Sequence, residues 1–371
     1  MKKVFKKALA VSLASAMVFS TAACGKKEEA PKETAAATQA AGTEEAKPAE
    51  SGESSLKGQN VRIVIGSTST SGDSYMIADT VNRYLSKEMG FNGKVDAIGN
   101  AAALDEIKNA KGDGKTVMMF HDMTFLSVLF GSVDQMYSLD NMTVGPRIGQ
   151  NPGACFGAAA EENFHSLQEV TQYLKDHPEE TLSFNIESGA TSHLAFVAYY
   201  LHVKETEGEA VANRMKAIVG GTTAEKLQRL WDRNADVIYG DVSAFEQYTV
   251  DGVEDQLKMT MFGSCGEVSG VDITSMAADG VKFAGEPFKF AKDFCMYFPK
   301  DMDPAVLAEY EAAMKKVTEN EEFRADMAKL HYNPLSADEV GVEASKKFIY
   351  DKNEMCKDLI AAAPSLDELT K

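Results

Sequence analysis

The chain has 371 residues, of which 44% are apolar and 25% charged, and its formal net charge at pH 7 is −18. This acidic balance argues against nucleic acid and against an anionic membrane surface as partners, and it also argues against electrostatic capture of anions at long range. The composition is typical of a globular protein, and the length predicts two domains. Any bound anion must therefore be held by donors close to it.

The first 23 residues have the pattern of a signal peptide. Four lysines within the first seven residues precede an apolar stretch from Ala8 to Phe19, and small residues follow. The stretch is too short to span a bilayer as a helix. Cys24 comes directly after the small residues, as in a bacterial lipobox, which predicts cleavage before Cys24 and lipidation of its thiol. Two acyl chains are enough for stable anchoring, so we expect an extracytoplasmic protein anchored to the cell membrane through Cys24. Ordinary signal cleavage beside an incidental cysteine is the alternative.

The segment 24–57 is rich in Ala, Glu, Lys, Thr, Ser and Pro, and Leu56 is its one large aliphatic residue. Such a segment cannot bury enough apolar surface to offset the entropy of ordering, which predicts a disordered tether. The remaining chain is interpreted as two domains. Residues 58–149 together with 293–371 are expected to form the first, and residues 150–292 the second, so that the chain crosses between them twice.

The body repeats the order of strand, small-residue loop and helix. Strands are expected at 61–65, 94–98, 116–120, 182–186, 215–219 and 235–239, with a mostly extended stretch at 144–156. Helices are expected at 76–87, up to 110, at 166–175, 194–204, 224–233, from 243 towards 250, and at 304–317, 320–330 and 338–361. Alternation of strands and helices predicts an α/β fold with a parallel sheet covered by helices.

Four loops, at 66–74, 188–193, 220–223 and 240–243, follow strands and precede helices. Ligands of open α/β sheets bind outside the carboxyl ends of the strands, and a helix N-terminus supplies unpaired N–H groups to an anion. A solvated turn that only caps the next helix is the alternative for each loop. Asp73 would repel an anion, so it is interpreted as a partner for a ligand amine or hydroxyl, or as a residue that orders the loop. The candidate ligand-binding residues are Ser67, Thr68, Ser71, Gly72, Asp73, His121, Ser188, Gly189, Ala190, Thr191, Ser192, His193, Gly220, Gly221, Thr222 and Asp241.

Neither a catalytic nor a metal site is expected. Ser192, His193 and Asp122 contain the groups of a hydrolase triad, but a triad is recognised by its geometry, and no Gly-x-Ser-x-Gly motif is present. No Cys-x-x-Cys pair or Cys/His metal spacing occurs. We therefore predict a protein that is not an enzyme and that needs no cofactor. The cysteines beyond Cys24 are interpreted as buried free thiols, and they are Cys155, Cys265, Cys295 and Cys356.

Several weak motifs occur in a characteristic order. They are a strand, loop and helix over 61–78, Gly-Ala-Thr-Ser-His-Leu-Ala at 189–195, Gly-Gly-Thr at 220–222 before Leu230 and Asp236, and Pro299 and Pro304 ahead of a long helix. In this order they resemble the substrate-binding proteins of tripartite tricarboxylate transporters, also called Bug proteins, over residues 61–359. The first loop departs from the family pattern, because Ser71, Tyr75 and Asp79 stand where glycine, aspartate and arginine are usual.

The resemblance implies a type II periplasmic binding protein fold, with two Rossmann-like α/β domains joined by a two-strand hinge. It also implies a small carboxylated metabolite held between the domains and delivered to membrane transporter subunits. We expect a monomer. A solute-binding protein of another importer class, such as an ABC system, and a cleft enzyme of the same topology remain alternatives.

Overall fold

The computed structural model describes residues 53–370. The predicted signal peptide, Cys24 and most of the predicted tether lie outside the described residues. The end of the predicted tether is folded: Leu56 is buried in the core, and the Ser54 hydroxyl donates a hydrogen bond of 2.7 Å to Glu309 Oε2. The predicted tether boundary at Lys57 is therefore too late, since residues 53–57 belong to the folded body.

The first sheet has six strands in the order β13-β4-β12-β3-β1-β2. Strand β1 is parallel to β2 and β3, whereas β12 is antiparallel to β3 and β4, so the sheet is mixed. All residues of β12 are buried, as expected for a strand with neighbours on both sides. The strands are β1 (Asn60–Ile65), β2 (Asn92–Ala97), β3 (Thr116–His121), β4 (Met142–Asn151), β12 (Lys292–Pro299) and β13 (Asn333–Pro334).

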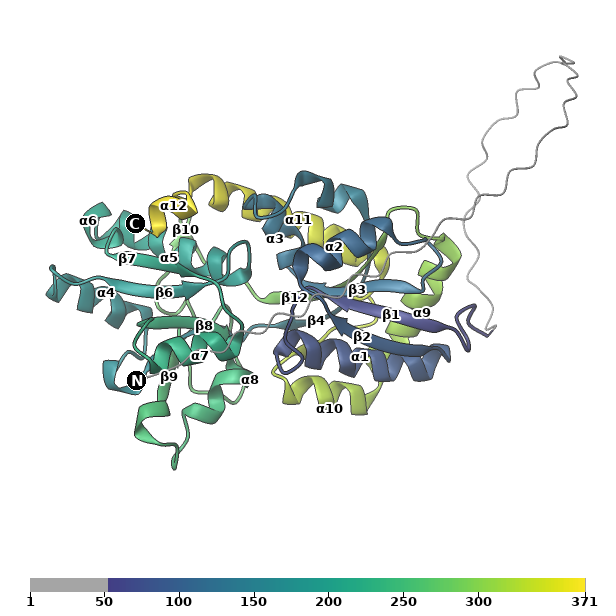
Figure 1. Cartoon of the computed structure of the whole chain (residues 1–371), viewed down its shortest axis with the longest axis horizontal. Helices are drawn as coiled ribbons and strands as arrows, with labels where there is room; N and C mark the ends of the chain where they lie inside the picture. The colour runs from purple at the N-terminus through teal and green to yellow at the C-terminus, as the bar shows by residue number, and fades with distance from the viewer. Residues whose placement is uncertain (1–52, 371) are drawn as a thin grey trace, which may run out of the picture. The chain divides into compact units, whose positions relative to one another are not determined.

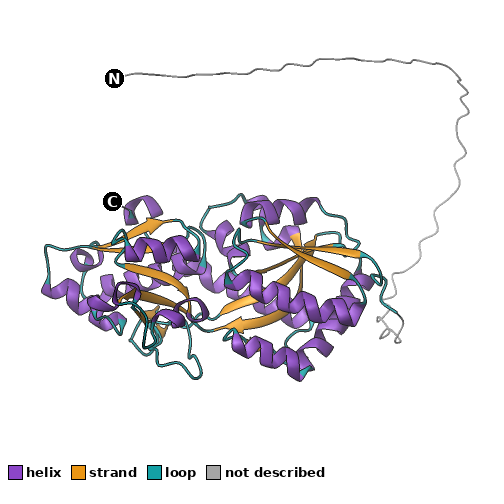
Figure 2. Ribbon diagram, turned by 60° about the horizontal axis from the view of Figure 1, so that its bottom comes forward, coloured by secondary structure: helices purple, strands orange, loops and turns teal. Residues whose placement is uncertain are grey.

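Helices cover both faces of this sheet (Figures 1 and 2). Local signals define several of their ends. Asp303 caps α9 by accepting a 2.8 Å hydrogen bond from the Ala305 N–H, and Asn320 caps α10 in the same way. Gly90 ends α1 in the left-handed conformation, with φ of 74°. The helices are α1 (Asp73–Met89), α2 (Asn100–Asn109), α3 (Met123–Leu129), α9 (Pro304–Glu319), α10 (Glu321–Lys329) and α11 (Val342–Ala362).

The second sheet has five strands in the order β7-β6-β8-β5-β9. Strand β6 is parallel to β7 and β8, and β5 is antiparallel to β8 and β9. The strands are β5 (Ala154–Ala159), β6 (Leu182–Ile186), β7 (Met215–Val219), β8 (Val237–Asp241) and β9 (Met259–Phe262), and a separate hairpin is formed by β10 (Lys282–Phe283) and β11 (Glu286–Pro287). The helices that follow these strands are α4 (Leu167–Asp176), α5 (Thr191–Thr206), α6 (Glu209–Ala212), α7 (Thr223–Trp231) and α8 (Val242–Phe245).

Short 3-10 turns complete the described part of the chain. They are η1 (Gln135–Tyr137), η2 (Leu139–Asn141), η3 (Ala160–Glu162), η4 (Glu246–Tyr248) and η5 (Asp255–Leu257). The helix expected towards residue 250 is instead the single turn α8 followed by η4. The extended stretch expected at 144–156 is two strands that belong to different sheets. They separate at Pro152, which has no N–H to donate to a ladder.

The chain passes between the two sheets from β4 to β5 and again on entering β12. The C-terminal segment also reaches the second sheet, because α11 contacts α5 and α12 (Leu366–Leu369) contacts β7 (Figure 1). The end of the segment 293–371, predicted to belong wholly to the first domain, thus packs on the second sheet.

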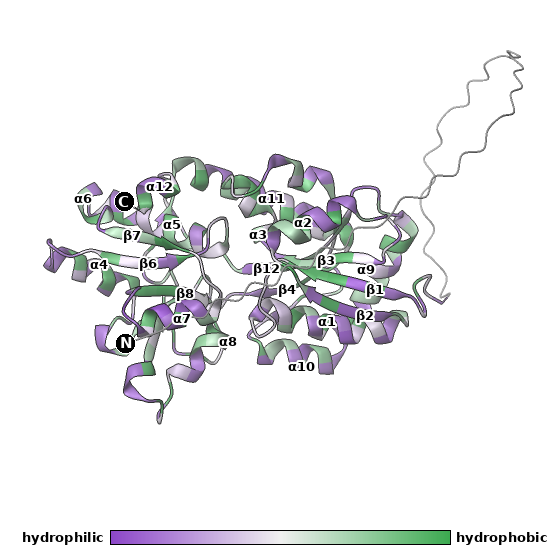
Figure 3. Cartoon of the chain, viewed as in Figure 1, coloured by the Kyte–Doolittle hydropathy of each residue, from purple (hydrophilic) through white to green (hydrophobic). Residues whose placement is uncertain are grey.

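Apolar residues gather on the central strands such as β3 and β8, and hydrophilic residues lie over the outer helices (Figure 3). Within residues 53–370, no helix has both the length and the apolar character that crossing a bilayer requires. The four cysteines of this part are buried free thiols, as predicted.

Candidate functional site

A cavity of about 410 Å³ lies at the carboxyl ends of strands from both sheets. Its volume is in the range of small-molecule sites. The cavity brings together the four loops singled out in the sequence, which lie far apart along the chain. Twelve predicted residues line it: Ser67, Thr68, Gly72, Asp73, His121, Ala190, Thr191, Ser192, Gly220, Gly221, Thr222 and Asp241. Its walls also contain residues outside the predicted set: Gly66, Ser69, Ser74, Gly99, Asn100, Phe120, Met123, Ala154, Glu187, Thr223, Glu225, Lys226, Tyr239, Gly240 and Lys292.

Four predicted residues do not line the cavity. Ser71 is exposed, and its backbone N–H and hydroxyl both bond to the Ser69 hydroxyl at 3.3 Å. It therefore orders the first loop rather than facing a ligand. The other three, Ser188, Gly189 and His193, lie on the side of the second loop that meets α3 and the residues after it.

The contacts of these three residues are structural. The Ser188 hydroxyl bonds to the Ser132 hydroxyl at 2.9 Å. The His193 ring stacks on Phe130, with the ring centroids 3.9 Å apart, and His193 Nδ1 accepts from the Gly189 N–H at 3.3 Å. Burial lowers the pKa of His193 to about 4, so the ring is neutral at pH 7. Ser188 and His193 thus contact the first domain, and Gly189 is bonded to His193 within the loop.

The longer helices whose N-termini lie at the cavity are α1, α2, α5 and α7. The N-cap residues of the first three, Gly72, Gly99 and Ala190, provide no capping side chain. Only α7 has a complete capping box, formed by Thr222 and Glu225. First-turn N–H groups have no partner within a helix, and the helix dipole favours negative charge there. The cavity is therefore rich in donors for an anion.

Lys226, in the first turns of α7, is the most informative wall residue. Its side chain is 6% exposed, and Nζ donates a hydrogen bond of 3.2 Å to the Tyr239 carbonyl. Burial lowers the pKa of this ammonium group, although Glu187 and Asp241 act in the opposite direction. No carboxylate of the described residues forms an ion pair with it. The cavity thus holds a buried positive charge that lacks a direct counter-ion.

Sequence reasoning missed Lys226 because a lysine in the first turns of a polar-looking helix is usually solvated. The sequence nevertheless contains a signal that Lys226 is buried. Leu230, four residues later, lies on the same helical face and is fully buried, so the face that carries Lys226 points inward. Lys292 was missed for a related reason. It begins a strand that is apolar after Asp293, and its neighbours across the sheet are distant in sequence.

Lys292 joins the two domains. Its Nζ lies 2.6 Å from Asp73 Oδ2 and 2.6 Å from Asp241 Oδ1. Tyr332 donates to Asp73 Oδ2 at 2.7 Å, and Asn151 Nδ2 donates to Asp241 Oδ1 at 2.8 Å. Burial, followed by the charge of Asp241, raises the pKa of Asp73 to about 6. One ammonium group therefore serves two carboxylates, and the cluster carries an excess negative charge at pH 7.

Three buried polar atoms on wall residues have no hydrogen-bond partner among the described residues. They are Asp73 Oδ1, Asn100 Oδ1 and Thr191 Oγ1. Buried polar groups are nearly always paired, so each of these atoms is a candidate hydrogen-bond partner for a ligand or a water molecule. Two of them, on the first domain, are acceptors. The third is a hydroxyl at the N-terminus of α5 on the second domain.

The groups of a hydrolase triad are not assembled. The Ser192 hydroxyl accepts a 2.8 Å hydrogen bond from the Glu187 N–H. Asp122 lies 2.8 Å from Lys352 Nζ and accepts from the Asp293 N–H, also at 2.8 Å, so it does not orient a histidine. His121 lines the cavity as a neutral ring, because burial, aided by the charge of Lys292, holds its pKa well below the usual value.

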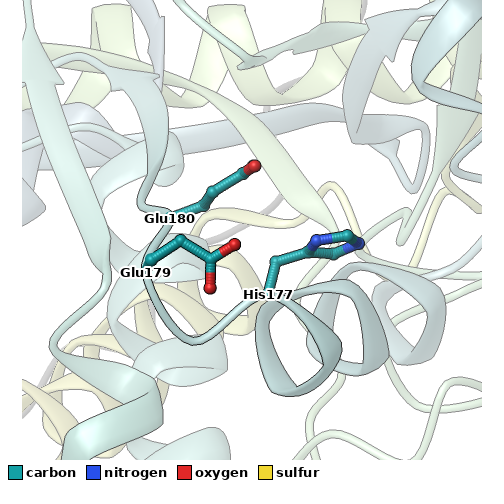
Figure 4. A group of neighbouring side chains, drawn as sticks. All are labelled: His177, Glu179 and Glu180. Carbon is teal, nitrogen blue, oxygen red and sulfur yellow. The ribbon is translucent and has the colours of Figure 1, made fainter.

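Among residues 53–370, one cluster of potential metal ligands lies elsewhere, on the loop after α4. Figure 4 shows His177, Glu179 and Glu180, whose ligand atoms lie within 4.8 Å of one another. Both glutamates are exposed, and Glu180 accepts a hydrogen bond from the Tyr173 hydroxyl. An exposed acidic cluster of this kind is common on protein surfaces, so we assign no ligand to it.

No family model and no curated protein matches the chain. Several solved structures, in contrast, are similar to this chain. MatC from Rhodopseudomonas palustris with bound malate superposes with a TM-score of 0.67 at 13% identity, over 81% of this chain and 99% of that one. The periplasmic binding protein BugD gives a TM-score of 0.65 at 16% identity, over 81% and 96%. An R. palustris protein with adipate gives 0.63 at 15% identity, over 82% and 98%.

The structural neighbours are Bug-type periplasmic binding proteins. The resemblance noted in the sequence is confirmed at this level, and so is the type II periplasmic binding protein fold. BugD among them is described as a periplasmic binding protein. At these identities the likeness establishes the fold, and the ligand has to be inferred from the cavity itself.

Proposed function

We propose that this protein is an extracytoplasmic solute-binding protein that holds a small carboxylate in the cavity between its two sheets. The observation that carries the proposal is the buried ammonium group of Lys226, which lines the cavity without a direct ion-pair partner. A buried charge is costly unless it is paired and hydrogen-bonded. A ligand carboxylate would supply the missing partner.

The surrounding donors fit the same ligand group. A carboxylate beside Lys226 would also accept from the unpartnered Thr191 hydroxyl and from first-turn N–H groups of α5 and α7. Gly220 and Gly221, with φ of 106° and 96°, adopt conformations that other residues rarely reach, and they shape the turn that enters α7. The structural neighbours solved with malate and with adipate support an organic acid as the ligand class.

The sequence also supports a proposal for where the protein is located and which membrane proteins it serves. We infer anchoring through a lipidated Cys24, with the chain before residue 53 as the tether, and delivery of the ligand to the membrane subunits of a tripartite tricarboxylate-type transporter. Closure of the two domains around the acid would report occupancy to those subunits. The motif order over residues 61–359 supports this transporter class, and the pattern at residues 1–24 supports the anchor.

Thermal-shift measurements and calorimetry with a panel of small organic and amino acids test the proposal. A ligand that binds only the folded state raises its melting temperature. We expect at least one acid to do so in the parent protein and in Lys216→Met, which removes a lysine of β7 outside the cavity. The same acid should stabilise Lys226→Met much less. Equal stabilisation of both variants would contradict the proposed role of Lys226.

A further inference from the structure

The C-terminal segment crosses from the first domain to the second along one side of the molecule. Helix α11 has 21 residues and is therefore about 30 Å long, and Figure 1 shows it running from the first sheet towards α12. Its buried residues recur at helical spacing over the whole length, so one face of the helix is covered from end to end. They are Val342, Ser345, Ile349, Lys352, Cys356 and Leu359.

The first half of α11 is fixed on the first domain. The Arg147 N–H of β4 donates a 2.8 Å hydrogen bond to the Ser345 hydroxyl. The buried Lys352 Nζ lies 2.8 Å from Asp122 Oδ1 and 2.7 Å from Asp293 Oδ2. Separating such a buried ion pair leaves a charge without compensation, so the pair opposes displacement of the helix. We therefore expect α11 to move together with the first domain.

The end of the segment packs on the second domain. Helix α11 contacts α5, and α12 contacts β7. The side chains of Leu359 and Leu369 are 4% and 2% exposed, and Ile360 and Leu366 are half-buried against the same core. Pulling the segment away from the second domain would expose this apolar surface to water, which is unfavourable.

Further contacts between the domains lie beside α11. This helix also contacts α3, and Phe130 at the end of α3 stacks on His193 in the first turn of α5. The hydroxyls of Ser132 and Ser188 bond at 2.9 Å. The two backbones are also close, because a Cβ atom on Gly189 would come within 2.8 Å of the Ser127 Cα. The side of α3 and α5 is therefore tightly packed.

The opposite side carries an exposed polar contact. Figure 1 shows α3 and α11 on one side of the crossing strands β4 and β12, and α8 and α10 on the other. There His331, which comes shortly after α10, meets Glu246, which follows α8. His331 Nε2 lies 3.0 Å from Glu246 Oε2, and the two side chains are 19% and 44% exposed. Exposed pairs of this kind contribute little to stability, so this one can separate easily.

We propose that residues 342–369 form a strap that holds the two domains together on the side of α3 and α5, so that they separate on the side of α8 and α10. Separation on the strap side would expose Leu359 and Leu369, whereas separation on the other side breaks the exposed contact of His331. Lys292, which also joins the domains, begins the crossing strand β12 and so lies near the axis of such a rotation. The inference goes beyond the proposed function and does not depend on the ligand.

Distances between spin labels in the full-length protein without ligand test the strap. Labels on non-natural residues at Val250 and Lys329 report on the side of α8 and α10, and labels at Met136 and Val219 report on the strap side. All four side chains are exposed, and this chemistry leaves the cysteines unlabelled. We expect a broad distribution of distances between 250 and 329 and a narrow one between 136 and 219. If the second distribution is as broad as the first or broader, the inference fails.

A variant of α12 tests whether the strap is the cause. Leu369→Asp places a charge in the buried contact with the second domain and should shift the distances between 136 and 219 to longer values. Met355→Asp makes the same kind of change at a side chain that is 54% exposed on α11, and it should leave these distances as in the parent protein. Circular dichroism checks folding. If Leu369→Asp does not fold, Leu366→Ser removes a half-buried leucine of α12 instead. Unchanged distances between 136 and 219 in the folded α12 variant would overturn the proposal.

Discussion

Replacing Lys226 by methionine should make the unliganded protein more stable and the ligand complex weaker. Methionine keeps the length and the apolar stem of the side chain, and it removes a buried charge that has no ion-pair partner among the described residues. Exchanging buried charges for apolar groups of similar volume is often stabilising by about 1–4 kcal/mol. The lost hydrogen bond to the Tyr239 carbonyl offsets about 1 kcal/mol of this. We therefore expect a net gain of up to about 3 kcal/mol in the free energy of unfolding.

Ligand binding should change in the opposite direction. A hydrogen bond between the ammonium group and a ligand carboxylate is worth about 1.5–3 kcal/mol, which corresponds to about a ten- to hundredfold loss of affinity in Lys226→Met. Urea unfolding without ligand and calorimetry with ligand measure the two effects separately. A variant that is strongly destabilised yet keeps full affinity would refute the reasoning, because Lys226 would then act through its bond to Tyr239 alone.

The pH dependence gives the same prediction an independent check. The folded-state pKa of Lys226 is lowered by burial from the ordinary value of 10.5. Between the lowered and the ordinary pKa the unfolded chain binds more protons, so stability due to this group rises with pH. The advantage of Lys226→Met should therefore be largest at neutral pH and should shrink as the pH approaches 10.5. A difference that stays constant over this window would contradict a buried charge at residue 226.

Three further predictions follow from the site and the sequence. Thr191→Ala should weaken carboxylate binding about tenfold, since it removes a hydroxyl donor, and it should leave urea unfolding nearly unchanged, because Thr191 Oγ1 has no protein partner. His193→Phe should keep full ligand affinity and should remove part of the acid sensitivity of the melting temperature. The pKa of His193 is lowered from 6.5 to about 4, so its contribution to stability is lost as pH falls through this window. Ligand binding that fails in this variant would place His193 in the site after all. Cys24→Ser should release the protein from membranes or leave it unprocessed, and fractionation that finds an unchanged, lipidated membrane protein would exclude the anchor.

Local sequence patterns were enough to predict most of the elements. Strands β6 and β7 lie at their predicted residues, and Ser166 caps α4 as expected. These features depend on apolar periodicity and on turn residues within a few positions of each other, which a single sequence displays directly. The same signals located the loops that line the cavity, because loops at the carboxyl ends of strands in one sheet must come together at one edge.

The contacts that only the tertiary structure reveals are those between residues far apart in the chain. Strand β12 inserts antiparallel between β3 and β4, and this places Lys292 between Asp73 and Asp241, which come from different domains. Asp73 and Lys292 are separated by 219 positions in the chain, and no local sequence pattern shows that they lie close together. His193 likewise looked like a ligand residue in its loop, but its ring stacks on Phe130 of the other domain. The sequence by itself determined which loops bear donors and which elements they connect. Burial and pairing across the domains decided which charges are left without partners, since the cost of a buried charge depends on every group that surrounds it.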